Sequence, residues 1–203
     1  SRILGFVRDL LIAAVFGAGP ATDAFFVAFR LPNLLRRLFA EGAFSQAFVP
    51  VLGHTREREG AQATQRRIAR GFTLLLAAVS AVTLVGIVGA GALIAVSSPG
   101  FLARPETFAL AVSMTRITFP SILFMSLVAL SGGVLNTWSR FAIPAFTPVL
   151  LNLTFIGMAL FAAPRFDRTV IALGWAVFIG GALQITFTLH SLTTVGMLPR
   201  FSF

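Results

Sequence analysis

Long apolar stretches, separated by short turn sequences, dominate this chain. Most of them reach the roughly 20 residues that an α-helix needs to cross the hydrocarbon core of a bilayer. Hydrophobic residues make up 57% of the 203 residues and charged residues 11%, with a mean hydropathy of +0.90. A water-soluble domain cannot cover so much apolar surface with so little charge, and the alternating segments typical of a transmembrane barrel are absent. The sequence therefore predicts an all-α, polytopic membrane protein.

Turn residues divide the chain into six expected membrane helices. The turns contain Gly19-Pro20, Pro99-Gly100 and Pro164. We expect the helices at residues 1–18, 21–50, 71–96, 107–135, 144–163 and 169–190. The second stretch is too long for one straight crossing, and Pro32 is expected to break it because proline removes a backbone donor. In transporters such a break often lines the ligand site, and an ordinary packing kink explains it equally well.

The distribution of arginine predicts the orientation in the membrane. Seven arginines fall on the side of the expected loop at residues 53–70, namely Arg56, Arg58, Arg66, Arg67, Arg70, Arg140 and Arg200, whereas Arg104, Arg165 and Arg168 fall on the other. The positive-inside rule places the loop in the cytoplasm. Because the loop also carries Glu57 and Glu59 and joins two membrane helices, topology explains its charge better than nucleic-acid binding.

The composition excludes several kinds of chemistry. All 16 basic residues are arginine, so no lysine can form a Schiff base, and no cysteine can act as a nucleophile or metal ligand. His54 and His190 are far apart, each at an expected helix end, so we expect no metal, cofactor or catalytic residue. An enzyme acting on lipid diphosphates would need a nucleophile, a metal cluster or paired carboxylates, and the acids in the first helices are scattered in depth.

Five arginines occupy the first two expected helices: Arg2, Arg8, Arg30, Arg36 and Arg37. An arginine at the centre of a membrane helix costs about 2.5–3.5 kcal/mol on insertion scales, so several are retained only beside a wet cavity, a partner charge or an anionic ligand. At a rise of about 1.5 Å per residue, Arg2 and Arg36 reach similar depths from opposite directions. Guanidinium groups stay charged and match phosphate oxygens. The pattern predicts a site for an anion such as a lipid diphosphate.

Internal ion pairs are the competing explanation for these arginines. Arg37 and Glu41 have the i,i+4 spacing of a helical ion pair, and Asp9 and Asp23 are the other acids of this region. Three acids cannot neutralise five arginines one for one, which favours an external anion. Asp23 is expected to serve in gating or local charge balance, or to cap the helix that follows it.

Two stretches resemble a known transporter family. They read SRILGFVRDLLIAAVFGAGPATDAFFVAFRLPNLLRRLFAEGAFSQAFVPVL and LNTWSRFAIPAFTPVLLN, and they are similar to the MurJ (MviN) family of lipid II flippases. The resemblance covers essentially the whole chain and is densest in the first 52 residues. It implies the fold of the MOP exporter superfamily, in which two helical lobes rock about a central cavity. Residues 1–203 would form one six-helix N-terminal lobe, truncated at both ends.

The resemblance also implies functional positions. The cavity arginines of the family fall on Arg2, Arg8 and Arg36, its functional aspartate falls on Asp23, and Glu41 matches a position associated with closing the outer side. The implied activity is transfer of undecaprenyl-diphosphate-linked peptidoglycan precursor between leaflets of the bacterial cytoplasmic membrane, without bond cleavage. The implied partners are lipid II, membrane lipids and a second lobe. An exporter of other anionic lipid-linked saccharides would share the fold but lack this dense arginine motif.

Overall fold

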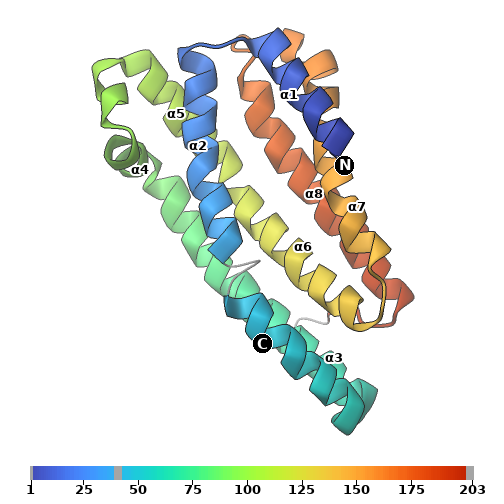
Figure 1. The fold of residues 1–203 in the computed structure, drawn as a ribbon. Helices are drawn as coiled ribbons and strands as arrows, with labels where there is room; N and C mark the ends of the chain where they lie inside the picture. Colours follow the sequence, from blue (N-terminus) through green and yellow to red (C-terminus); the bar gives the residue numbers. More distant parts are fainter. Residues whose placement is uncertain (1, 39–42, 200–203) are drawn as a thin grey trace.

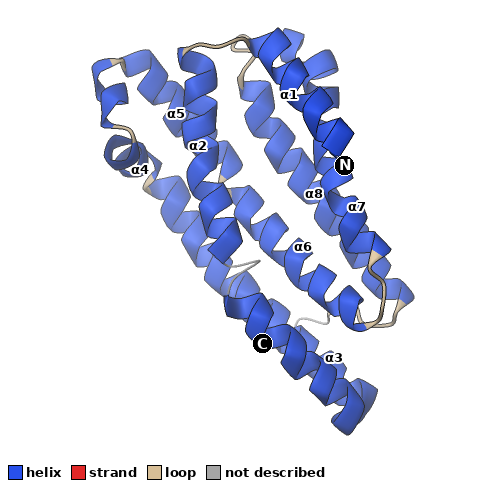
Figure 2. Cartoon of the chain, in the orientation of Figure 1, coloured by secondary structure: helices blue, strands red, loops and turns tan. Residues whose placement is uncertain are grey.

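The computed structural model describes residues 2–38 and 43–199, and these residues form helices with no strand among them (Figures 1 and 2). The helices are α1 (Arg2–Phe16), α2 (Pro20–Arg36), α3 (Ala43–Val88), α4 (Ala90–Ser97), α5 (Pro105–Thr118), α6 (Pro120–Thr137), α7 (Ala142–Gly157) and α8 (Ile171–Thr194). Short 3₁₀ turns lie at Pro99–Ala103 and Ala163–Arg165, and a π-helical turn at Met158–Ala162 extends α7. The predicted all-α class is confirmed.

Among the described residues, four helical stretches are long and apolar enough to cross a membrane: Gln46–Val88, Pro105–Thr137, Ala142–Arg165 and Ile171–Thr194. The expected helix at 107–135 corresponds to α5 and α6, which follow each other with only Phe119 between them. The helices expected at 1–18, 144–163 and 169–190 are present with small shifts at their ends. The third expected helix, 71–96, corresponds to the second part of α3 followed by α4.

Pro32 does not break the second helix, so this prediction is wrong. α2 continues through the proline to Arg36, and α3 begins at Ala43. Proline has no N–H for the Ala28 carbonyl one turn earlier. The hydroxyl oxygen of Thr118, on α5, lies 3.3 Å from that carbonyl oxygen and 3.3 Å from the Thr115 carbonyl oxygen. A neighbouring helix thus offers the donor that proline lacks, which lets α2 tolerate it.

The segment expected as a loop, residues 53–70, is helical. α3 reverses direction at Gly60, whose φ of 79° and ψ of −177° are open to glycine alone among the common residues. The two arms lie against each other: a Cβ added to Gly71 would sit 2.6 Å from the ring of Phe48, although a straight helix would separate these residues by about 34 Å. The segment is rich in arginine, glutamate, glutamine and alanine, which favour helix, and this preference prevailed over the expected loop.

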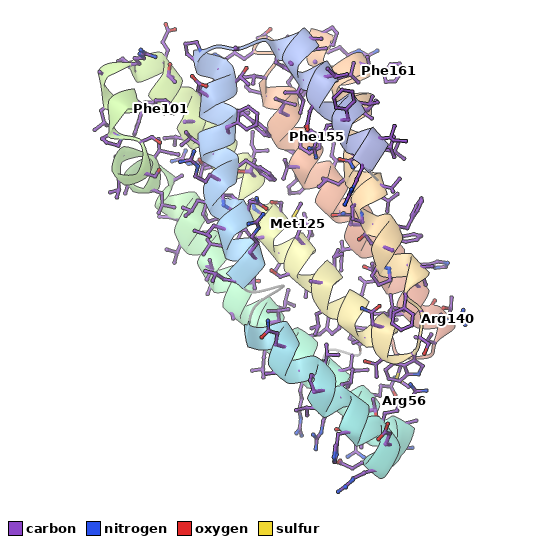
Figure 3. All side chains as sticks on the ribbon, in the orientation of Figure 1. Arg56, Phe101, Met125, Arg140, Phe155 and Phe161 are labelled. Carbon is purple, nitrogen blue, oxygen red and sulfur yellow. The ribbon has the colours of Figure 1, made fainter. Side chains whose placement is uncertain are left out.

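Two arginines of this hairpin have partners within the protein. Arg67 pairs with Glu59 at 3.0 Å across the turn. Arg56 donates a hydrogen bond to the Thr137 carbonyl at the end of α6, and its guanidinium carbon lies 4.7 Å from the Trp138 ring centroid (Figure 3). The Arg56 contacts therefore attach the hairpin to the C-terminal end of α6.

The helices pack around α6, which contacts α2, α3, α7 and α8 (Figure 1). One apolar cluster joins α2, α5 and α8 around Phe25, Met114 and Leu173. A second joins α3, α6 and α8 around Phe72 and Leu130. In contrast, α1 packs mainly against α7 and the π-helical turn, at the edge of the bundle. α1 and α2 therefore stand on either side of a space backed by α6 and α7.

Candidate functional site

A cavity of about 1130 Å³ lies between α1, α2, α6 and α7. Its polar lining residues are Arg8, Asp9, Thr22, Asp23, Asn33, Asn136, Thr147 and Gln184. Apolar residues and glycines supply the rest, among them Met125 of α6 and Phe155 of α7, which Figure 3 labels. The cavity combines an apolar surface with a few polar groups, which is the usual character of a ligand site.

Arg8 is held in the cavity by two hydrogen bonds, an ion pair with Asp9 and one aromatic ring. Its Nε and Nη2 lie 2.9 Å and 2.7 Å from Oδ1 of Asp9, and its Nη1 donates to Oδ1 of Asn152 at 3.0 Å. The guanidinium carbon lies 5.8 Å from the Phe155 ring centroid. Asn152 is buried on α7, whereas the Arg8 side chain keeps 31% of its surface exposed. Because a guanidinium has five N–H groups, one remains available on each terminal nitrogen.

The other predicted site residues do not all gather here. Arg2 is exposed on α1, does not line the cavity and makes no polar bond to the described part of the chain. Arg36 is the last residue of α2, and its side chain lies outside the description. Glu41 falls outside the described residues, and with it the expected contact to Arg37. The predicted convergence of Arg2 and Arg36 at one depth stays a prediction.

Asp23 lines the cavity from the first turn of α2. Gly19 occupies the N-cap position, and the Asp23 backbone N–H donates to the Gly19 carbonyl at 3.0 Å, so Asp23 is already inside the helix. The capping interpretation is therefore wrong. A carboxylate in the first turn still interacts favourably with the helix dipole, which leaves the charge of Asp23 as its relevant property.

The charge of the described lining differs from the expectation of an arginine-rich cavity. Arg8 is the one described cation there, and Asp9 and Asp23 are the acids, which gives a formal charge of −1. Asp9, proposed from sequence as a possible internal partner, does pair with an arginine, its neighbour Arg8. The described walls alone therefore do not attract anions.

Sequence reasoning missed the neutral polar residues of the site. Asn152 positions Arg8, and Gln184 of α8 donates from its amide nitrogen to the Thr147 carbonyl on α7 at 2.7 Å. The Thr147 hydroxyl in turn donates to the Pro144 carbonyl, which the following proline, Pro148, leaves without its helical donor. Asparagine and glutamine within apolar helices were the available signal, because such residues commonly bond across membrane helices.

A family model described as lipid II flippase MurJ matches residues 12–203. That match spans most of the chain and includes every helix from α2 onward. The chain belongs to the MurJ family of lipid II flippases. Because the chain belongs to this family and its described residues include four apolar helical stretches long enough to cross a membrane, it is part of a multi-pass membrane protein.

Known members of the MurJ family are similar in sequence or structure to nearly the whole chain. The lipid II flippase MurJ of Burkholderia cenocepacia is 50% identical over 199 residues, which are 98% of this chain and 39% of that protein. The probable lipid II flippase MurJ of Vibrio cholerae is 44% identical over 207 residues, 98% of this chain and 39% of that protein. A solved structure, lipid II flippase MurJ in an inward closed conformation, superposes with a TM-score of 0.78 at 30% identity, covering 100% of this chain and 41% of that one. The chain thus spans about two fifths of the length of these relatives.

Proposed function

We propose that the protein containing this chain is a lipid II flippase. It moves undecaprenyl-diphosphate-linked peptidoglycan precursor from the cytoplasmic to the outer leaflet of the bacterial cytoplasmic membrane by alternating access. The observation that carries the proposal is Arg8, an arginine held in a cavity between membrane helices with two N–H groups available. Those groups suit the oxygens of a diphosphate. The relatives are named as flippases, and the proposed cycle makes and breaks no covalent bond.

The proposed diphosphate site needs more positive charge than the described walls contain. We assign this charge to Arg2 and Arg36 together with Arg8, and to a second lobe supplied by other residues of the parent protein. A binding site between two lobes also requires both of them for a rocking cycle. The 203-residue chain by itself is therefore expected not to translocate lipid II.

Asp23 and Glu41 are proposed to act in gating or charge balance. Asp23 lies at the start of α2 and lines the same cavity as the Arg8–Asp9 pair. A carboxylate there repels a diphosphate that moves past Arg8 and attracts an arginine that swings toward it. This arrangement supports a role in changing the charge seen by the substrate as the helices move.

The experiment is leaflet-resolved measurement of lipid II in cells depleted of their own flippase. Full-length protein containing this chain should restore outer-leaflet lipid II, whereas its Arg8→Ala variant should not, at equal abundance in the membrane. Arg104→Ala is the matched control, because Arg104 is an exposed arginine that precedes α5 and does not line the cavity. Restoration of another anionic lipid-linked saccharide, without restoration of lipid II, would identify the protein as an exporter of that saccharide.

A further inference from the structure

Gln184 is a buried amide that reaches the cavity from the second layer of helices. It is the one residue of α8 in the described lining, and 6% of its surface is exposed. Its amide nitrogen donates to the Thr147 carbonyl. Because the partner is a carbonyl, the group that faces it must be the nitrogen. The amide oxygen makes no hydrogen bond to the described part of the chain.

An acceptor without a protein partner at the edge of a cavity is free to bind a ligand. Among the described residues, the buried side-chain atoms without a partner are Thr83 Oγ1 and Ser126 Oγ, so the Gln184 oxygen is accessible from the cavity it borders. Gln184 borders the cavity, so a group inside the cavity can donate to its oxygen. Neither the arginine site nor the helix packing described above uses this atom.

The neighbouring surface leaves room for a neutral ligand. The α6 residues that line this end of the cavity are Ala129, Gly132 and Gly133, followed by Asn136 one turn later. The Asn136 side chain is exposed and makes no hydrogen bond within the described residues. The small residues leave space beside the helix, and Asn136 adds both a donor and an acceptor. This end of the cavity has no charged side chain among the described residues.

The separation from Arg8 suits adjacent parts of one substrate. Arg8 bonds to Asn152 and Gln184 bonds to Thr147, five residues earlier on α7. At about 1.5 Å per residue, the two polar groups are offset by roughly 7.5 Å along the helix. An axial offset of this size matches the spacing between a phosphate and the sugar ring attached to it.

We propose that Gln184 and Asn136 form a neutral subsite that binds the saccharide next to the diphosphate. The subsite rests on the proposed flippase function and assigns headgroup selectivity within it. Hydroxyl and acetamido groups of the sugar donate to the Gln184 oxygen and exchange hydrogen bonds with Asn136. Arg8 recognises the diphosphate, and these amides recognise what the diphosphate carries.

The test compares two lipids bound to the full-length protein in nanodiscs. Lipid II and undecaprenyl diphosphate share the tail and the diphosphate, but only lipid II carries the saccharide. Gln184→Met, which removes the amide at similar length, should weaken lipid II binding by about three- to tenfold, the range of one neutral hydrogen bond. Binding of undecaprenyl diphosphate should not change. Arg8→Ala should weaken both ligands, and Gln62→Met on the exposed hairpin should weaken neither.

Asn136→Ala provides a second variant, because its exposed side chain has no structural bond to lose. It should also lower the preference for lipid II over undecaprenyl diphosphate. Equal weakening of both lipids, or no change in their ratio in either variant, would show that Gln184 only braces α7 and would overturn the subsite. Failure of the unaltered protein to bind lipid II would instead refute the flippase proposal.

Discussion

Replacing Arg8 by lysine tests whether the cavity needs a guanidinium or only a positive charge. In the structure, Arg8 donates from Nε to Asp9 and from Nη1 to Asn152, and its Nη2 lies 2.7 Å from Oδ1 of Asp9. At least one N–H group remains on each terminal nitrogen, in the geometry that matches two phosphate oxygens. A lysine ammonium has three donors, so after bonding to Asp9 and Asn152 it keeps one for the ligand.

The expected loss follows from this donor count. One hydrogen bond involving charged groups contributes about 1.5–3 kcal/mol, so Arg8→Lys should weaken lipid II binding by about 10- to 150-fold. Arg8→Ala should weaken it at least as much, because it also removes the charge. The assays are binding of lipid II to the purified full-length protein and complementation of a depleted strain, with membrane abundance measured for each variant.

Arg30→Lys is the matched control for this exchange. Arg30 lies on α2, is exposed, does not line the cavity and makes no polar bond to the described residues. Its substitution should change binding little. If Arg8→Lys binds lipid II within a few-fold of the unaltered protein, the argument from paired donors is wrong and only positive charge is required. The same comparison at Arg36 extends the test to the other strong candidate, where lysine should again fail nearly as badly as alanine.

Three other substitutions have expected outcomes. Asp23→Asn and Asp23→Ala should impair complementation equally, because the residue acts by charge and not as a cap; rescue by asparagine alone would contradict this. Thr118→Val should lower the stability of the purified protein by about 0.5–1.5 kcal/mol in thermal unfolding, since it removes the donor near the carbonyl freed by Pro32, whereas Thr118→Ser should be nearly neutral. Gly86→Ala should lower stability by about 1–3 kcal/mol because its Cβ would fall inside an aromatic ring, whereas Gly91→Ala, with nothing within 4 Å, should not.

Helix positions were predictable where local features determine them. The apolar length of α7 and α8 and the turns before α2 and α5 are visible in a short window of sequence. The fate of Pro32 was not, because its tolerance depends on Thr118, which lies far along the chain on α5. The hairpin at Gly60 was missed although local features indicated it. Its charged residues suggested a loop, but their intrinsic preference is helical.

The site residues also divide into those that local sequence reveals and those that depend on contacts between distant helices. Arg8 was recognisable because an arginine in an apolar helix is expensive and therefore informative. Asn152 and Gln184 are neutral, and their sequence positions do not show which helix each one meets. Their importance appears only when α7 meets α1 and α8, at contacts that join residues 144 and 37 positions apart. Sequence identified Arg8, and the fold identified the groups that orient it.

The described lining poses an electrostatic problem that bears on the mechanism. Five arginines and three acids in the first two expected helices favoured an external anion, yet the charged residues of the described lining are Arg8, Asp9 and Asp23, a formal charge of −1. A lipid diphosphate is itself negative, so these walls would repel it at long range although Arg8 can bond to it at short range. Under the flippase function proposed above, attraction is expected from arginines whose side chains lie outside the described lining and that approach Arg8 during the cycle, or from a second lobe. A site completed by movement binds tightly in one state and releases in another, which is what net transport between leaflets requires.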